Sequence, residues 1–430
     1  MNTFIKRYKV ELIVVITTAL MFNIAAFILP PNFRGLSFYT LFFIFDVFIS
    51  VIFFSISKWQ GAKRIIFLIL FWSPFTLLCF IVLFGIFFPF PDWNIYTKVI
   101  AVALLFALLI AHFILSLFLL ITLVLRRLTK SRHLSNSLIY GGMVISLFVF
   151  TICAIAPFYW TVSPKIVAVD IKTEKISKGF DGYKIVQLSD MHFDFFIDDK
   201  LLQATVDSIE KLQPDVIMIT GDIVTYKADE LKPFLKTLRQ LQAPDGVYFV
   251  MGNHDYGSYY RWKTERESLK NDAKLLQYFE RLGWKILRNK SDYLICRNDT
   301  IAVAGTENKC FHQSHYPCDG DIELALREVP VFYPVIVMTH DPVYWEEELR
   351  YNERPLFLTL SGHTHGMQIG YRTKTKQWGL YRVLNKYSNG LYYENEKYLY
   401  INSGLGTVGF PFRIGLNPEI TLLTLKHPAS

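Results

Sequence analysis

Five short motifs rich in aspartate, asparagine and histidine occur in order between residues 189 and 365. They read SDMH at 189–192, GD at 221–222, GNHD at 252–255, THD at 339–341 and GHTH at 362–365. Their side chains offer carboxylate, amide and imidazole groups. Zinc, iron, manganese and nickel ions accept such a mixture of oxygen and nitrogen ligands, whereas calcium prefers oxygen. The residue types therefore predict divalent-metal chemistry.

The spacing within the motifs suggests how these side chains come together. Asp190 and His192 are two residues apart, and His363 and His365 repeat the same spacing. In an extended segment, a period of two places both side chains of a pair on the same side. A glycine precedes Asp222 and lets the backbone turn sharply close to an ion. One such motif alone is common in loops of many proteins, but five motifs in this order indicate a single site.

Most of the motifs follow a short apolar run rich in β-branched residues, which is typical of a buried strand. Strands are expected at 184–190, 215–220, 247–251, 293–296, 301–305, 335–339, 356–360, 398–402 and 420–425, and helices at 200–212, 228–241 and 265–282. The early alternation predicts an α/β domain with a partly parallel sheet, and the later strands predict a second sheet. Ligands bind at the carboxyl ends of strands in open α/β sheets, where these motifs lie.

The first 160 residues have a different composition from the rest and are mostly apolar. A bilayer about 30 Å thick is crossed by about 20 helical residues. Five stretches are long enough, at 12–29, 36–57, 65–88, 99–125 and 138–159. We therefore expect an all-α membrane domain of five spans at 1–160, a hinge at 161–164 and a soluble domain at 165–430. Five spans exclude a simple cleavable signal peptide.

Charge divides at the same place. Residues 1–160 contain 12 Lys and Arg but 3 Asp and Glu, a net charge of +9, whereas residues 161–430 have a net charge of −1. The pI of about 9.0 therefore comes from residues that flank the membrane stretches. It does not come from the basic surface of a nucleic-acid-binding protein, so no nucleic-acid partner is expected.

The loop charges predict an orientation. Positive residues cluster before the first stretch and after the second and fourth, at Lys6, Arg7, Lys9, Lys58, Lys63, Arg64, Arg126, Arg127, Lys130 and Arg132. Positive loops stay on the cytoplasmic side of a membrane. The N-terminus is therefore expected inside the cell, and with an odd number of spans residues 161–430 are expected outside the cytoplasm.

The ordered motifs DMH, GD, GNHD, a histidine after a strand and GHTH resemble the calcineurin-like metallophosphoesterase superfamily. The resemblance covers about residues 165–430. The tail GLGTVGFPFRIGLNPEITLLTL at 404–425 is similar to a bacterial membrane- or envelope-associated subfamily. The anchored arrangement is also similar to transmembrane metallophosphoesterase-domain proteins. This resemblance implies a β-sandwich flanked by helices, two divalent metal ions of the Mn, Zn, Fe or Ni type and a location in a bacterial cell membrane.

The resemblance also implies a ligand set for two ions that share one carboxylate. One ion would be held by Asp190, His192, Asp222 and His365, and the other by Asp222, Asn253, His340 and His363. His254 would bind no metal. It would lie over the phosphate as a charge stabiliser or general acid, oriented by Asp255 or another carboxylate.

Three further residues near the motifs have two interpretations each. Arg413, in the GFPFRIG segment, could bind a phosphate or be a structural arginine. Asp341 could orient His340 or have no such role. Met367 stands where the subfamily usually has the second glycine of GHTHGGQ. A positive φ would strain Met367 there; alternatively the loop is altered and substrate access differs.

Two cysteines, Cys310 and Cys318, close a short loop, and Cys296 is left over. A disulfide between Cys310 and Cys318 is allowed outside the cytoplasm. Free thiols are a second interpretation. A structural zinc held with His312 and His315 is a third, although the spacing is unlike common zinc sites.

Taken together, these features predict a membrane-anchored binuclear phosphoesterase. It would hydrolyse phosphate ester or pyrophosphate bonds by a metal-activated hydroxide, with a phosphorylated, lipid-linked or envelope substrate and membrane lipids as partners. One alternative is a non-catalytic binding or signalling module with a degenerate site. Another is a transporter or sensor driven by the spans, whose support is Asp46 and His112 within them.

Overall fold

The computed structural model describes residues 88–428 apart from gaps at 130–131, 160–162, 197–198, 311–315 and 374–376, together with part of 65–84. The chain divides into two compact units, Met1–Tyr159 and Trp160–Ser430. The first two predicted spans, including Asp46, lie outside the described residues. So do His312 and His315, two of the four proposed zinc ligands.

The described part of the first unit contains two long apolar helices, α5 (Ile95–Thr129) and α6 (Arg132–Tyr159), after a short 3-10 helix, η2 (Phe90–Asp92). Both long helices have the length and hydropathy of a membrane span. They contain the fourth and fifth predicted stretches. The third is described in part, as the shorter apolar helix Ile65–Pro74. Among the described residues, two helices of spanning length are therefore present, where five spans were predicted over 1–160.

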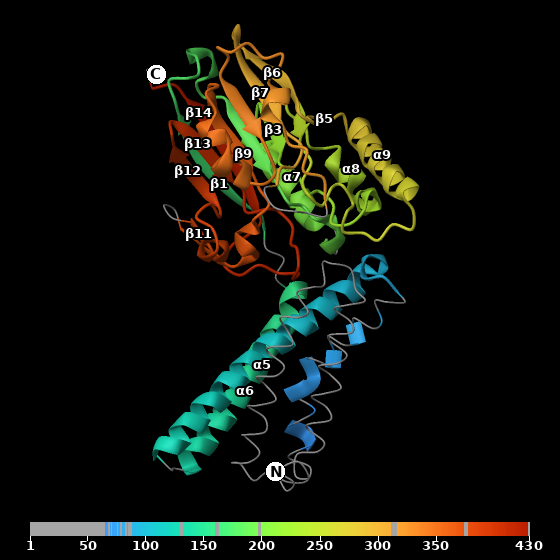
Figure 1. Cartoon of the computed structure of the whole chain (residues 1–430), viewed down its shortest axis with the longest axis vertical. Helices are drawn as coiled ribbons and strands as arrows, with labels where there is room; N and C mark the ends of the chain where they lie inside the picture. Colours follow the sequence, from blue (N-terminus) through green and yellow to red (C-terminus); the bar gives the residue numbers. More distant parts are fainter. Residues whose placement is uncertain are drawn as a thin grey trace. The chain divides into compact units, whose positions relative to one another are not determined.

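The second unit contains two six-stranded sheets that pack face to face (Figure 1). The first has the order β1-β14-β2-β3-β4-β5, with β1 Lys165–Lys172, β14 Glu419–Lys426, β2 Lys184–Leu188, β3 Val216–Ile219, β4 Val247–Phe249 and β5 Lys285–Ile286. The second has the order β12-β13-β9-β8-β7-β6, with β12 Gly390–Glu394, β13 Lys397–Ile401, β9 Leu356–Ser361, β8 Val335–Met338, β7 Asp299–Gly305 and β6 Lys290–Cys296. A hairpin of β10 (Gly370–Arg372) and β11 (Gln377–Gly379) stands apart.

Parallel pairing in the middle of each sheet positions the motifs. Strands β2, β3 and β4 are parallel neighbours, as are β7, β8, β9 and β13. All residues of β3, β4, β8 and β9 are buried. Strands covered on both faces are continuous apolar runs, which is why the sequence revealed them. Their carboxyl ends meet at one edge of each sheet.

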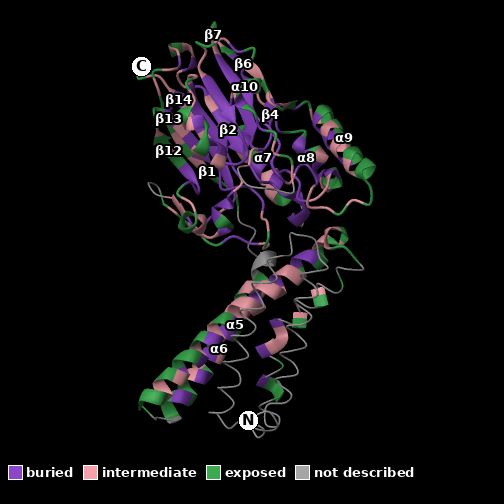
Figure 2. Cartoon of the chain, in the orientation of Figure 1, coloured by how far each residue is buried: buried purple, intermediate pink, exposed green. Residues whose placement is uncertain are grey.

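The strands of both sheets consist largely of buried residues (Figure 2). One cluster joins the facing sides of the two sheets, with Met218 and Tyr248 from the first and Ile336 and Leu360 from the second. Another lies between the first sheet and the helices α7 (Lys200–Leu212), α8 (Leu235–Leu238) and α9 (Glu265–Leu282). A third covers the second sheet with α10 (Ile322–Ala325) and α11 (Val343–Glu347). The predicted α/β domain with two sheets is confirmed.

Of two predicted helices, one is present as predicted and the other is replaced by a different kind of helix. Helix α9 matches its prediction, because Thr264 caps its first turn by accepting from the Glu267 amide and Gly283 ends it at φ 75°. The predicted helix at 228–241 is instead a 3-10 helix, η5 (Ala228–Phe234), followed by one turn of α8. Pro233 lies inside this segment and lacks the amide that a regular α-helix needs.

Candidate metal centre

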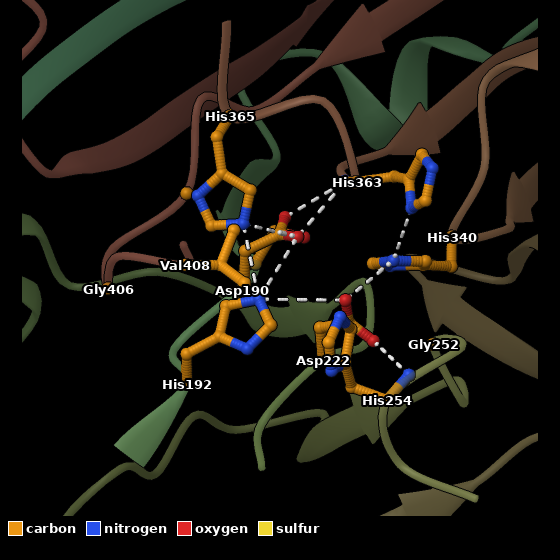
Figure 3. Close-up of polar contacts among 12 residues, drawn as sticks. Asp190, His192, Asp222, Gly252, His254, His340, His363, His365, Gly406 and Val408 are labelled. Carbon is orange, nitrogen blue, oxygen red and sulfur yellow. Dashed lines mark hydrogen bonds and ion pairs between the residues drawn. The ribbon is translucent and has the colours of Figure 1, made fainter. Parts of the chain in front are cut away.

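All the predicted ligands lie in turns that directly follow a strand. Those turns follow β2, β3, β4, β8 and β9, and they carry Asp190, His192, Asp222, Asn253, His254, His340, His363 and His365. Figure 3 shows the imidazole and carboxylate groups converging from both sheets. The structure therefore brings every predicted metal ligand into one cluster, at the carboxyl edge where the strands end.

The backbone at five of these residues is left-handed. The φ angles are 52° at Asp190, 48° at His192, 54° at Asp222, 70° at His363 and 50° at His365. Side chains with a β-carbon rarely adopt this conformation, and such strain persists where the surrounding structure imposes it. An extended segment would also place both members of each pair on one side. The structure corrects this, because tight left-handed turns aim the side chains inward.

The first group of ligand atoms comes from Asp190, His192 and His365. The His365 Nε2 lies 3.3 Å from Asp190 Oδ1. It also lies 3.1 Å from His192 Nε2. The backbone amide of His363 donates to the Asp190 carboxylate at 3.0 Å and fixes its orientation. All three side chains of the group are buried.

The second group comes from Asp222, His340 and His363, with the amide oxygen of Asn253 beside them. The His340 Nε2 lies 3.1 Å from Asp222 Oδ2. The His363 Nδ1 lies 3.2 Å from His340 Nε2. The same His363 nitrogen lies 2.9 Å from Asn253 Oδ1. Four potential ligand atoms therefore surround one point.

A single oxygen of Asp222 lies between the two groups, because Asp222 also forms a set of possible ligands with His192 and His254. Its Oδ2 is 3.1 Å from His340 Nε2 and 3.6 Å from His192 Nε2. The other oxygen, Oδ1, accepts a hydrogen bond from the His254 amide at 2.9 Å. A side chain could not replace the hydrogen of Gly252, because a β-carbon there would collide with Asp222. The glycine therefore permits this close approach.

The hydrogen bonds on the outer nitrogens decide which imidazole atoms can bind cations. The His340 Nδ1 lies 2.7 Å from the Thr220 carbonyl oxygen, so this nitrogen carries a proton and Nε2 is the nitrogen available to a cation. The His363 Nε2 faces Asp341 Oδ2 at 3.8 Å, and its Nδ1 is directed inward, toward Asn253 Oδ1 and His340 Nε2. His340 Nε2, His363 Nδ1 and Asp222 Oδ2 therefore face one another at this point. This donor set fits a divalent cation.

The charge balance of the cluster supports the same interpretation. Burial would raise the pKa of Asp222, but the neighbouring His340 and His254 outweigh it and hold that pKa well below its usual value. Burial would lower the pKa of His340, but the Asp222 carboxylate raises it to about 10. Burial lowers the pKa of His192 well below its ordinary value. The ionised carboxylate of Asp222 thus attracts positive charge into a buried site.

Comparison with known proteins identifies the family. The calcineurin-like phosphoesterase family model matches residues 183–367. The chain is 31% identical over 314 residues to a transmembrane protein with metallophosphoesterase domain from Danio rerio, which corresponds to 70% of this chain and 67% of that protein. The chain belongs to the calcineurin-like phosphoesterase family. Membership implies phosphoesterase activity and divalent-metal binding.

Other relatives extend this comparison. The uncharacterized metallophosphoesterase YkuE of Bacillus subtilis is 31% identical over 265 residues, covering 60% of this chain and 83% of that protein. The bovine transmembrane protein with metallophosphoesterase domain is 30% identical over 268 residues, covering 61% and 57%. Among solved structures, the phosphopantetheinyl hydrolase of Mycobacterium tuberculosis aligns with a TM-score of 0.32 and 12% identity, over 54% of this chain and 91% of that one.

His254, the histidine predicted to act on the phosphate, lies beside the cluster of predicted metal ligands. The His254 Nδ1 is 2.8 Å from the Thr225 carbonyl oxygen. Its ring stacks on the ring of Tyr259, with centroids 4.1 Å apart and planes at 15°. The prediction that Asp255 orients His254 is therefore replaced by an orientation through Thr225 and Tyr259.

Asp255 instead holds the backbone of two ligand turns together. One of its oxygens accepts from the amides of Asp222 and Gly252, each at 2.8 Å. The other accepts from Ile223 at 2.9 Å and Val224 at 3.2 Å. Both oxygens are thus occupied by amides away from the imidazole of His254. The structure therefore gives Asp255 a role in positioning the two ligand turns rather than the predicted role of orienting His254.

The surroundings of Arg413 favour a structural arginine over a substrate-binding residue, the two interpretations that the sequence left open. Its side chain is 4% exposed and donates from Nε to the Gly406 carbonyl at 3.0 Å. Its Nη2 lies 3.3 Å from His365 Nδ1. The guanidinium therefore lies behind a ligand histidine, buried in the fold, and supports the GLGT turn rather than offering an open phosphate contact.

Two smaller questions from the sequence are answered by the geometry. Met367 has φ 55° and keeps the left-handed backbone that a glycine would adopt, with its side chain 38% exposed. Asp341 faces His363 rather than His340. Sequence reasoning missed Thr220, Thr225 and Tyr259, because two of them act through backbone carbonyls and Tyr259 belongs to no spacing pattern.

A disulfide joins Cys310 to Cys318, with their α-carbons 5.4 Å apart. This excludes the free-thiol and zinc interpretations, since both thiols are consumed. Cys296 remains a free thiol and contacts the Gly179 carbonyl oxygen.

Proposed function

We propose that this chain is a membrane-anchored phosphoesterase that hydrolyses phosphate ester or pyrophosphate bonds at a site for two divalent cations. The observation that carries the proposal is the position of Asp222 Oδ2, within 3.6 Å of His192 Nε2 and 3.1 Å of His340 Nε2. One carboxylate oxygen shared by two ligand groups suits a pair of cations. The donor set favours Mn, Zn, Fe or Ni.

Two bound cations would orient the phosphate, neutralise its charge and lower the pKa of a water. The residues of the chain then have separate tasks. Asp190, His192, Asp222 and His365 would hold one cation, and Asp222, Asn253, His340 and His363 the other. His254 keeps a proton on Nδ1 through Thr225, so its Nε2 is the atom able to exchange a proton with the leaving oxygen.

Burial lowers the pKa of His254, although the Asp222 carboxylate opposes this effect. A dianionic phosphate beside the ring would favour the protonated imidazole further. His254 would therefore stabilise charge and donate a proton once substrate is bound. Tyr259 and Thr225 restrict the ring to the orientation that this transfer needs.

We also propose the membrane arrangement that the sequence predicts: five spans within residues 1–160, the N-terminus in the cytoplasm and the phosphoesterase domain at 165–430 outside it, in a bacterial cell membrane. Helices α5 and α6 support two of these spans. The Cys310–Cys318 disulfide supports the location of the domain, because disulfides persist in oxidising compartments and are rare in the cytosol.

The proposed substrate is a phosphorylated, membrane-associated or lipid-linked molecule, and the membrane lipids are the second partner. The near-neutral charge of residues 161–430 does not favour a nucleic acid. The non-catalytic alternative would expect a lost ligand, yet all seven predicted ligands converge. The transport alternative has little support among the described residues, where His112 packs against the ring of Phe71 at 4.4 Å.

The test is hydrolysis by the detergent-purified chain of p-nitrophenyl phosphate, bis-p-nitrophenyl phosphate and a panel of lipid phosphates, with Mn²⁺, Zn²⁺ or EDTA. Metal-dependent turnover is expected for the wild type and should be lost in Asn253→Ala and His254→Ala. The matched control is Asn298→Ala, in a surface turn remote from the ligand cluster. Absence of turnover with every metal, while two ions remain bound, would contradict the proposal.

A further inference from the structure

We infer that an apolar surface next to the metal centre docks onto the bilayer to which the chain is anchored. We call this surface the apolar rim. Its members are large hydrophobic side chains with high exposure, namely Met367 at 38%, Tyr371 at 51%, Val383 at 71%, Leu384 at 73% and Ile414 at 43%. Exposed apolar patches mark protein or membrane interaction sites.

The backbone holds the members of the apolar rim together. The Gly370 amide donates to the Ile414 carbonyl at 2.9 Å, and the Ile414 amide donates to the Gln368 carbonyl at 2.8 Å. The Leu380 amide donates to the Ile369 carbonyl at 2.7 Å, which brings the 3-10 helix η8 (Leu380–Val383) to the same place. The five side chains therefore come from three hydrogen-bonded segments.

The apolar rim is continuous with the metal centre. Met367 and the ligand His365 belong to the same short 3-10 helix, η7 (His365–Gln368). The Gln368 side chain donates to the carbonyl oxygens of Phe410 at 2.9 Å and Phe412 at 3.0 Å. It thereby fastens the segment that carries Ile414. A membrane that contacts the apolar rim would lie beside the ligand histidines.

The attachment of the domain to the membrane helices indicates the bilayer as the occupant. Five residues of sequence separate the end of α6 at Tyr159 from the start of β1 at Lys165. An extended chain spans about 3.5 Å per residue, so Lys165 stays within roughly 20 Å of the end of α6. The side of the domain that carries Lys165 is therefore near enough to the bilayer to contact it.

Lys165 and the apolar rim occupy the same side of the domain. Lys165 pairs with Glu419 at the start of β14, and its amide donates to the Pro418 carbonyl at 2.8 Å. Ile414 lies only five positions before Glu419. Glu419 also forms an ion pair with Arg372, the neighbour of Tyr371. The start of β1 and the β10 strand that carries Tyr371 therefore meet at Glu419.

The side chains around the apolar rim have the chemistry of a membrane interface. The ring of Tyr371 stacks on that of Trp378, with centroids 6.0 Å apart and planes at 16°. Arg382 is exposed between apolar neighbours on η8. Tyrosine and tryptophan are enriched at the headgroup level, and arginine beside apolar side chains attracts lipid phosphates.

This inference rests on the proposed function and narrows its substrate class. The site would act on an amphiphilic phosphate ester whose apolar part stays in the bilayer while its headgroup reaches the metal centre. The apolar rim would bring the site to the headgroup level. Soluble phosphate esters would reach the metal centre without any contact between the apolar rim and the bilayer.

The direct test is photo-crosslinking of the full chain in vesicles of phosphatidylcholine and phosphatidic acid. The photoreactive amino acid p-benzoylphenylalanine replaces Leu384 in one variant and Phe332 in a matched control. Phe332 is 74% exposed but precedes β8, at the opposite end of the strand from the site. Lipid adducts are expected at position 384, at least roughly tenfold above position 332. Equal yields, or an adduct with a second copy of the chain, would overturn the inference.

An activity ratio provides the second test. In the same vesicles, the double variant Val383→Asp and Leu384→Asp should lose roughly tenfold in hydrolysis of a lipid phosphate, while p-nitrophenyl phosphate hydrolysis stays unchanged. The control is Val331→Asp with Phe332→Asp. A parallel loss on both substrates would refute the docking role. If the wild type hydrolyses neither, the proposed function fails, and the crosslinking result still decides the docking surface.

Discussion

The amide nitrogen of Asn253 donates to the hydroxyl oxygen of Tyr259 at 2.9 Å. An asparagine amide can point either way, and this bond directs Oδ1 toward His363 and the second ligand group. The same tyrosine ring stacks on His254. Tyr259 therefore positions both a metal ligand and the histidine expected to act on the phosphate.

Substitution of Tyr259 should separate these two effects. Tyr259→Phe removes the acceptor for Asn253 but keeps the ring, so the affinity for the second metal ion should fall about tenfold. Tyr259→Leu also removes the stacking and should lower kcat further. The measurement is metal titration together with kcat and KM. Tyr260→Phe is the matched control, and equal metal affinity in wild type and Tyr259→Phe would refute this role.

Asp255→Asn should destabilise the phosphoesterase domain rather than alter its proton transfer. Both carboxylate oxygens of Asp255 accept hydrogen bonds from backbone amides. In asparagine an NH₂ group replaces one of these oxygens, so it must face at least one N–H donor. We expect a loss of about 3 kcal/mol in the free energy of unfolding. Urea unfolding measures it, with Asp292→Asn as a surface control. An unchanged unfolding midpoint with a shifted pH–rate profile would instead support the role predicted from sequence, in which Asp255 orients His254.

The sequence predicted the ligand cluster well because its physical basis is local. Buried parallel strands are continuous apolar runs, so the residue after each run is placed at the sheet edge, as with Asp222 and His340. Helix α9 was predictable because Thr264 and Gly283 mark its ends. These features depend on short stretches of chain.

The features that the sequence did not reveal depend on contacts between distant segments. The left-handed turns at Asp190 and His363 arise where two turns meet, since the His363 amide donates to the Asp190 carboxylate. Arg413 looks like a phosphate ligand in sequence, yet its partner is the carbonyl of Gly406 in the preceding turn. Asp255 adjoins His254 in the chain but faces amides from another turn. Spacing rules do not encode such tertiary partners.

Metal removal should destabilise the phosphoesterase domain. A ligand that binds the folded state alone stabilises it by about 2.7 kcal/mol at one hundred times its dissociation constant. Addition of Mn²⁺ should therefore raise the thermal unfolding temperature of the EDTA-treated chain. Asp222→Asn should abolish most of this shift, because it weakens both ligand groups. Asp292→Asn, which affects a surface pair with Lys285, should keep the shift. An equal Mn²⁺ effect in wild type and Asp222→Asn would contradict a shared carboxylate.

Acid should destabilise the fold through Glu419, the buried carboxylate at the start of β14. Burial would raise the pKa of Glu419, but Arg372 and hydrogen bonds from Ser403, Tyr400 and Thr421 outweigh it and lower the pKa below its ordinary value of 4.5. A group with a depressed folded pKa contributes stability that is present above the unfolded pKa and is lost as pH falls through the folded pKa. The loss should therefore appear below about pH 4.5.

Thermal unfolding of the full chain between pH 3 and pH 7 measures this dependence. Glu419→Gln should unfold at a lower temperature than wild type at neutral pH, because Arg372 then lacks its anionic partner. It should also lose less stability on acidification than wild type. Glu396→Gln, at an exposed turn beside Lys175, serves as the control and should follow the wild-type curve. Parallel acid curves for wild type and Glu419→Gln would show that other carboxylates carry the acid sensitivity.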